Sequence, residues 1–305
     1  MIFPKPKIVV IVGPTASGKS DLAVLMGRKF SGEVVSADSR QVYRGLNIGT
    51  GKITPDEMLG IPHHLLDVAS AEDVFTVSDY KQLAQVAISE IIERNNLPII
   101  CGGTGFYIQA LVDGIELPNV PPNERLRESL EPFSASALYE KLKELDSEFA
   151  DIVDRNNPHR LIRAIEIATA LGHVPKITSD PPYDACFVGI STDLYTLRER
   201  IHTRLLSRIE SGMIDEVKML HEGGLSFKRM DSLGLEYRYV ARHLEGKLDL
   251  EEMLTQLENE IFQYAKRQFT WFKRDGRISW FEKDDSRGIS EYAEKHLNKK
   301  PADAG

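Results

Sequence analysis

The chain has 305 residues, and its content of 42% hydrophobic and 28% charged residues is typical of a globular protein with a packed core. A formal net charge of −8 argues weakly against nucleic-acid binding, so any such site must be a local basic groove on an acidic body. No apolar run approaches the roughly twenty residues of a membrane span, and no N-terminal signal peptide is recognisable. The two cysteines, Cys101 and Cys186, lie in apolar runs, which predicts buried thiols in a reducing compartment. We therefore expect a cytoplasmic protein without a membrane partner.

Strand and helix signals alternate through about the first hundred residues, which predicts an α/β fold with a mainly parallel sheet. The predicted strands are apolar runs at 8–12, 33–37 and 97–101, with a further short candidate at 64–68. Helices are predicted at 18–30 and, from a clear amphipathic stripe, at 77–94. Polar clusters at 13–20, at 38–41 and at Thr104 each follow a strand. Because ligands collect at the carboxyl ends of parallel strands, we expect these clusters to share one crevice.

The pattern changes after Gly114, where the proline-rich stretch 117–122 reads as a linker. Helical segments follow at 123–131, 135–145 and 158–171, and strand character returns at 186–190. We therefore predict a small helical domain, 118–184, inserted into a catalytic core formed by 1–117 and 185–305. The C-terminal part of this core is expected to be helical, at 194–222, 233–245 and 250–272, before a short strand at 278–281.

A phosphate-binding loop of the form G-x-x-x-x-G-K-[ST] stands between the first strand and the first helix. Its backbone N–H groups and the positive helix N-terminus form a nest for a di- or triphosphate. Lys19 adds a point charge, and the Ser20 hydroxyl suits a phosphate-bound Mg²⁺. The motif predicts a phosphate ligand without deciding whether it is a nucleotide. The loop residues are Gly13, Pro14, Thr15, Ala16, Ser17, Gly18, Lys19 and Ser20.

Asp38 ends an apolar strand, so it could be the Mg²⁺-binding aspartate of an NTPase, a role for which Asp67 is also a candidate. A plain structural function, as a strand-end or helix-capping residue, is open as well. Thr104 lies in a Gly-Gly-Thr-Gly turn, and these glycines could serve only to permit a tight bend.

Basic residues gather in three places despite the acidic total. Arg160 and Arg163 can share a helical face in the predicted insertion, and Arg200, Arg204 and Arg208 form a stripe at a spacing of four. The segment 266–274 interleaves cations with aromatics, a combination that suits phosphates and stacked bases. Spacing alone does not separate these functions from solvated helix faces.

Taken together, the motifs resemble those of the bacterial tRNA dimethylallyltransferases, also called tRNA isopentenyltransferases. The resemblance runs in order along nearly the whole chain. It rests on G-P-T-A-S-G-K-S at 13–20, D-S-R-Q-V-Y at 38–43, G-T-G-K at 49–52, G-G-T-G-F-Y at 102–107, N-P-H-R-L-I-R-A-I-E at 157–166 and A-K-R-Q-F-T-W-F at 265–272.

The resemblance implies a P-loop α/β fold and an activity on tRNA. The dimethylallyl group of dimethylallyl diphosphate would move to N6 of the adenosine 3′ to the anticodon, in tRNAs that read codons beginning with U, with Mg²⁺ as cofactor. It implies that Asp38 is the general base, that Thr104 and Arg204 serve catalysis beside the diphosphate, and that Ser20 lies near Mg²⁺. We expect the enzyme to be a monomer that binds the anticodon arm. The expected tRNA contacts are Asp38, Ser39, Arg40, Gln41, Thr104, His159, Arg160, Leu161, Ile162, Arg163, Lys266, Arg267, Trp271, Lys273 and Arg274.

Two other enzyme classes share the P-loop and stay open at this point. One is an adenylate isopentenyltransferase, which prenylates a free adenine nucleotide, and the other is a P-loop kinase or NTPase. The sequence also departs from the family pattern late in the chain. There the stretch 233–239 matches only loosely and leaves Tyr237 and Arg238 without a clear role.

Overall fold

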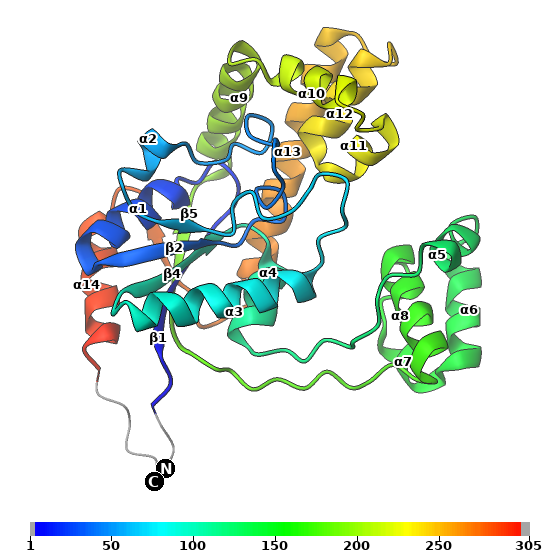
Figure 1. Ribbon diagram of the computed structural model, residues 1–305, viewed down its shortest axis with the longest axis horizontal. Coiled ribbons are helices and arrows are strands. Elements are labelled where there is room, and N and C mark those ends of the chain that lie inside the picture. The colour runs from blue at the N-terminus through cyan, green and yellow to red at the C-terminus, as the bar shows by residue number, and fades with distance from the viewer. Residues whose placement is uncertain (1–3, 300–305) are drawn as a thin grey trace. The chain divides into compact units, whose positions relative to one another are not determined.

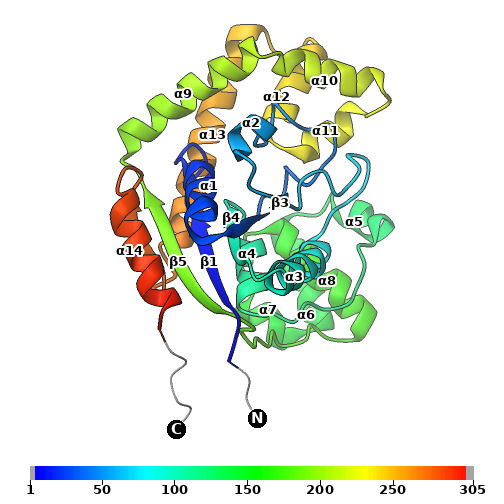
Figure 2. The ribbon, with the colours of Figure 1, turned by 60° about the vertical axis from the view of Figure 1, so that its left-hand side comes forward.

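The computed structural model describes residues 4–299, and the predicted α/β fold with a parallel sheet is confirmed there (Figures 1 and 2). Within this range six strands form one sheet in the order β3-β2-β4-β1-β5-β6, and every neighbouring pair is parallel. The strands are β1 (Lys7–Val12), β2 (Gly32–Ser36), β3 (His63–His64), β4 (Leu97–Gly102), β5 (Asp184–Ser191) and β6 (Ser279–Glu282).

Helices cover both faces of this sheet, which explains why its central strands are apolar throughout. One face packs against α3 (Val77–Glu93) and α4 (Gly105–Val112), and the other against α1 (Lys19–Phe30) and α14 (Ser286–Leu297). In β1, the side chains of residues 8–12 are all fully buried. The predicted buried thiols are confirmed too, since Cys101 and Cys186 are free and buried in β4 and β5.

A helical C-terminal part lies beyond the carboxyl ends of the strands (Figure 2). Its apolar core also includes Val42, Tyr43 and Leu46, so the loop after β2 packs against the helices of this C-terminal part. The expected single helix over 194–222 is in fact two, because Gly212 adopts a left-handed φ of 95° between them. The helices are α9 (Leu194–Glu210), α10 (Met213–Glu222), α11 (Phe227–Leu233), α12 (Leu235–Leu244) and α13 (Leu250–Phe272).

Residues 115–180 form a separate compact unit with its own apolar core. Its helices are α5 (Glu124–Leu130), α6 (Ala135–Leu145), α7 (Ser147–Ile152) and α8 (Pro158–Leu171). The predicted boundary at 184 needs correction, because Asp184 is already the first residue of β5 and pairs with Lys7 of β1.

Two further details differ from the expectations. The third strand is only His63–His64, because Leu65 and Asp67 turn the backbone out of the sheet with φ values of 63° and 57°. Helices α4, α7, α11 and α14 and the short helix α2 (Pro55–Met58) were not expected. None of the helices in 4–299 is both long enough and apolar enough to span a membrane.

Candidate functional site

Three neighbouring strands, β2, β4 and β1, end together and bring the expected polar clusters to one edge of the sheet. The ends of β2 and β4 approach very closely, since a Cβ on Gly102 would lie 2.1 Å from the Ala37 carbonyl oxygen. The N–H of Thr104 donates to that same carbonyl at 3.1 Å. Glycine at 102 is therefore required for the two strand ends, and for the residues that follow them, to meet.

The loop after β1 has the geometry of an anion nest. Ala16 and Gly18 take positive φ values of 60° and 89°, which turns successive backbone N–H groups toward one side. No side chain caps the N-terminus of α1, so its first N–H groups are free to meet an anion. Burial lowers the pKa of Lys19, while Cys101 and Asp38 raise it and Arg204 lowers it further. Lys19 therefore lies within electrostatic reach of both Asp38 and Arg204.

Asp38 and Thr104 are held by a small network of backbone bonds. Asp38 accepts from the N–H groups of Arg40 at 2.8 Å and Gln41 at 3.4 Å, both through Oδ1. Its Oδ2 has no partner among residues 4–299 and is open to accept a proton. Thr104 Oγ1 accepts from the N–H of Ser39 at 3.0 Å, so the turn after β4 is tied to the residue next to Asp38.

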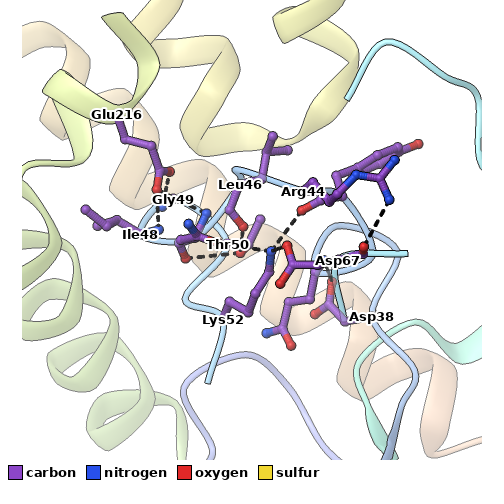
Figure 3. Close-up of polar contacts among 12 residues, drawn as sticks. Asp38, Arg44, Leu46, Ile48, Gly49, Thr50, Lys52, Asp67 and Glu216 are labelled. Atoms are coloured by element: carbon purple, nitrogen blue, oxygen red, sulfur yellow. Dashed lines mark hydrogen bonds and ion pairs between the residues drawn. The ribbon is translucent and has the colours of Figure 1, made fainter. Parts of the chain in front are cut away.

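A buried glutamate fixes the loop 47–49 (Figure 3). Glu216, on α10, accepts from the N–H groups of Asn47, Ile48 and Gly49 at 2.7–3.0 Å. It also accepts from the Tyr237 hydroxyl at 2.7 Å. Burial and the Glu216 charge raise the pKa of Tyr237, which keeps this phenol a donor. Sequence reasoning missed Glu216 entirely and gave Tyr237 no role.

The organised loop in turn holds two arginines of α9. Arg208 donates to the Gly49 carbonyl at 3.1 Å and pairs with Glu236 at 3.0 Å, and Arg204 donates to the Gly51 carbonyl at 3.4 Å. Burial and the neighbouring Arg208 charge lower the pKa of Arg204 to about 10, still well above neutrality, so it remains a cation. The predicted arginine stripe thus points into the core at Arg204 and Arg208.

The G-T-G-K stretch contributes a second group of polar contacts to the same loop, centred on Lys52. The Lys52 ammonium donates to the Tyr43 carbonyl, to Asn47 and to the Asp67 carboxylate, and only 6% of its side chain is exposed (Figure 3). Asp67 lies in the turn after the edge strand β3, where the Arg44 guanidinium also donates to its carbonyl. Because the Asp67 carboxylate forms an ion pair with Lys52, it is poorly placed to serve as a metal ligand beside the P-loop.

The remaining predicted residues of the 38–41 cluster have defined partners. Arg40 donates to the Ser232 carbonyl at 2.9 Å, and the Gln41 amide donates to the Gly51 carbonyl at 3.3 Å. The Gly51 carbonyl therefore accepts hydrogen bonds from both Gln41 and Arg204. This cluster links the end of β2 to the loop that holds the arginines.

The basic and aromatic segment lies at the end of α13. Its cations are exposed and several lie over rings, with Lys273 4.5 Å from the centroid of Phe269. Trp271 instead packs inward, since a Cβ on Gly105 at the start of α4 would lie 2.3 Å from its ring. Tyr264, on the same helix, is 37% exposed; partial burial raises its pKa to about 12, and the Asp38 charge adds to the rise. The exposed members are Lys266, Arg267, Lys273 and Arg274.

The expected contacts in the 115–180 unit lie on α8 and fall into two groups. His159 and Arg160 are exposed at its first turn. The Leu161 side chain is 0% exposed, so it packs the core of the unit and the expectation of a side-chain contact with tRNA is corrected. Ile162 is half-buried against the same core. Arg163 is bonded to Glu166 and to the Val120 carbonyl.

Residues 4–299 hold no group of three or more His, Cys, Asp or Glu side chains arranged for a metal ion. Ser20 is exposed at the start of α1 and offers one hydroxyl. Any Mg²⁺ at this loop would therefore need most of its ligands from the bound phosphate and from water, an arrangement that Mg²⁺ accepts readily.

Comparisons with known proteins find relatives along most of the chain. The IPP transferase family model matches residues 41–275. The tRNA dimethylallyltransferase 1 of Geotalea daltonii is 43% identical over 279 residues, which cover 90% of each chain. The tRNA dimethylallyltransferase of Anoxybacillus flavithermus is 38% identical, over 92% of this chain and 91% of that one.

Solved structures match over nearly the whole of this chain as well. The crystal structure of the tRNA isopentenylpyrophosphate transferase of Bacillus halodurans aligns with a TM-score of 0.73 at 35% identity and covers 96% of this chain and 98% of that one. A eukaryotic dimethylallyltransferase acting on tRNA aligns with a TM-score of 0.80 at 24% identity, covers 98% of this chain and 81% of that one, and shows the fold alone. From the family match and these identities, the chain belongs to the IPP transferase family.

Proposed function

We propose that the chain is a tRNA dimethylallyltransferase. It transfers the dimethylallyl group of dimethylallyl diphosphate to N6 of the adenosine 3′ to the anticodon, in tRNAs that read codons beginning with U, and it acts in the cytoplasm. The observation that carries the proposal is the meeting of an anion nest, two half-buried cations and an open carboxylate, since the charges of Asp38 and Arg204 both act on Lys19. These are the groups that a diphosphate leaving group and an amine nucleophile need.

The diphosphate is bound by the loop 13–20. The N–H groups at the start of α1 and the Lys19 ammonium meet its oxygens, and Arg204 adds a second cation. As the allylic C–O bond breaks, negative charge develops on the departing diphosphate. Fixed donors and cations around that oxygen stabilise the transition state more than the ground state, which lowers the barrier.

Asp38 removes the proton of the attacking amine. The N6 lone pair of adenine is delocalised into the ring, so transfer of an N6 proton to Asp38 Oδ2 while the new C–N bond forms makes the nitrogen a better nucleophile. The two N–H groups on Oδ1 hold the carboxylate in place. Thr104, fixed to Ser39, lies in the turn beside it. The adenosine must leave its stack to reach this carboxylate.

Mg²⁺ fits this site as a partner of the bound diphosphate. Ser20 would contribute its hydroxyl, and the phosphate oxygens and water would complete the set. When bound, the ion supplies positive charge that neutralises the leaving group. The monomeric state stays a prediction.

Label transfer tests the function directly. Pure protein, Mg²⁺, unmodified tRNA and labelled dimethylallyl diphosphate are incubated without nucleotide, and we expect the label in tRNA at the adenosine 3′ to the anticodon. A requirement for ATP would favour an NTPase, and faster labelling of free AMP would favour an adenylate isopentenyltransferase. Either result contradicts the proposal.

The variant Asp38→Asn tests the role of the base. It keeps the shape of the side chain and removes the proton acceptor, so turnover should fall by about 10²–10⁴-fold while both substrates still bind. Turnover and Mg²⁺ titration are measured together. Substantial rescue by excess Mg²⁺, with weakened diphosphate affinity in its absence, would make Asp38 a metal ligand instead.

A further inference from the structure

A single glutamine joins the two loops of the site. Gln268 lies on α13, and only 7% of it is exposed. Its Oε1 accepts from the N–H of Thr15 in the P-loop at 2.8 Å. Its Nε2 donates to the Gly103 carbonyl, in the turn after β4, at 2.9 Å. Both ends of one buried amide are therefore used, each on a different loop.

The chemistry of this position suits glutamine closely. A neutral donor and a neutral acceptor are needed on adjacent atoms at the end of a side chain long enough to reach from α13. Glutamate would keep the acceptor and lose the donor, and leucine would lose both. The fit is tight, because a Cβ on Gly103 would lie 2.3 Å from Nε2. A buried N–H or carbonyl left without its partner is costly, so the loops have little freedom to move apart while this amide is in place.

The two loops that Gln268 joins carry different parts of the reaction. Thr15 belongs to the loop that holds the diphosphate, while Gly103 precedes Thr104, which binds the residue next to Asp38. We propose that Gln268 is a positioning residue that sets the distance between the diphosphate loop and the Asp38–Thr104 side of the site. In this way it keeps the allylic carbon aligned with N6. The inference rests on the proposed function, and a displacement of about 1 Å between reacting groups can cost about 10²-fold in rate.

Two substitutions separate positioning from simple stabilisation. Gln268→Leu removes both bonds, and we expect kcat to fall about 10–100-fold and the affinity for inorganic diphosphate to weaken, with KM for tRNA unchanged. Gln268→Glu keeps the bond to Thr15, so diphosphate affinity should stay close to that of the wild type while kcat falls. Gln256→Leu is the matched control, because Gln256 is exposed on the same helix and should leave all of these values unchanged.

The pH profile of Gln268→Glu gives the sharpest readout. A protonated glutamic acid can donate to the Gly103 carbonyl as the amide does, so the ratio of its kcat to that of the wild type should rise as pH falls. A flat ratio, or a loss of melting temperature in Gln268→Leu with kcat and diphosphate affinity unchanged, would overturn the proposal. Diphosphate binding is measured without tRNA. It therefore still reports on Gln268 if the wild type fails to prenylate tRNA, a result that would count against the proposed function alone.

Discussion

Two buried glutamates organise the two units of the chain, and they do so with different partners. Glu216 in the core is 6% exposed and is surrounded by neutral donors, the three backbone N–H groups of 47–49 and the Tyr237 hydroxyl. Glu166 in the 115–180 unit is 2% exposed and takes two guanidinium groups, those of Arg127 and Arg163, besides the Asn123 N–H.

The difference decides what the arginines beside each glutamate can do. Because Glu216 is satisfied without a cation, Arg204 remains free to serve a bound anion, and its only protein acceptor in the described chain is the distant Gly51 carbonyl, at 3.4 Å. Glu166 forms ion pairs with both arginines around it, so the charge of Arg163 is already neutralised. A count of basic residues therefore overstates how many cations of the 115–180 unit are available to bind an anion. In the core, Arg204 is available because no carboxylate within residues 4–299 neutralises it.

Among the variants that test this comparison, the largest effect is expected at Arg204. The variant Arg204→Gln should reduce turnover about 10²–10³-fold, as removal of one donor to a developing oxyanion typically does, and should weaken diphosphate binding. Steady-state kinetics with each substrate varied in turn measure both effects. Arg208→Gln is the control from the same helix and should lose less, because Arg208 is neutralised by Glu236. Equal losses at both positions would contradict the distinction.

Glu166 should make stability depend on pH. Burial alone would raise the pKa of this carboxyl, but bonds from Arg127, the Asn123 N–H and Arg163 lower it to about 2, from an ordinary value of 4.5. A depressed folded-state pKa contributes stability above the unfolded pKa, and this contribution is lost as pH falls from about 5 toward 2. The shift corresponds to about 3 kcal/mol at pH 7.

Urea unfolding of wild type and Glu166→Gln at pH 7 and pH 4 measures this effect. The wild type should be the more stable at pH 7, and the gap should narrow at pH 4, because the carboxyl is then largely protonated in the unfolded state while it is still ionised in the folded state. Glu33→Gln is a parallel control in the core, since Arg94 above all lowers the pKa of Glu33 to about 2. A gap that does not change with pH would show that charge is not the basis of the Glu166 network.

Glu216→Gln should lower the free energy of unfolding by less, about 1–3 kcal/mol. The new amide N–H would face one of the buried donors, which would then lack an acceptor. We also expect KM for dimethylallyl diphosphate to rise, since the loop that holds Arg204 loosens, whereas KM for tRNA should hold. Tyr237→Phe removes one of the four donors and should give a smaller change in the same direction. Thermal unfolding and kinetics together check both variants, and a loss of stability without any change in this KM would limit Glu216 to folding.

The smallest effect is expected at Arg160. Since this side chain is exposed, Arg160→Gln should weaken tRNA binding modestly and reduce the salt slope by about 0.7–0.9, the value of one lost phosphate contact. Arg163→Gln should instead lower stability and leave the slope nearly unchanged, because its guanidinium is occupied by Glu166. Filter binding of tRNA across a salt series distinguishes the two. The reverse pattern would return the phosphate contact to Arg163.

Much of this site could be predicted from sequence because its signals are local. The P-loop, the strand before Asp38 and the Gly-Gly-Thr-Gly turn each lie within a few residues, and parallel strands bring their ends together. Glu216 and Gln268 could not be found this way, because their partners lie far away in sequence, on loops that they reach only after the helices pack. One local signal was available: Arg163 and Glu166 are spaced i, i+3 on a helix, a spacing that favours an ion pair.

The close approach at Gly102 has a consequence for how the chain tolerates change. A Cβ there would meet the Ala37 backbone at 2.1–2.7 Å, and backbone cannot rotate away as a side chain can, so even alanine is excluded from this position. Gly172 is different, since it has a φ of 81° but no neighbour within 4 Å. Asparagine, which visits the left-handed region readily, should be accepted at 172. A library randomised at both positions and selected for activity should therefore return glycine alone at 102 and several residue types at 172.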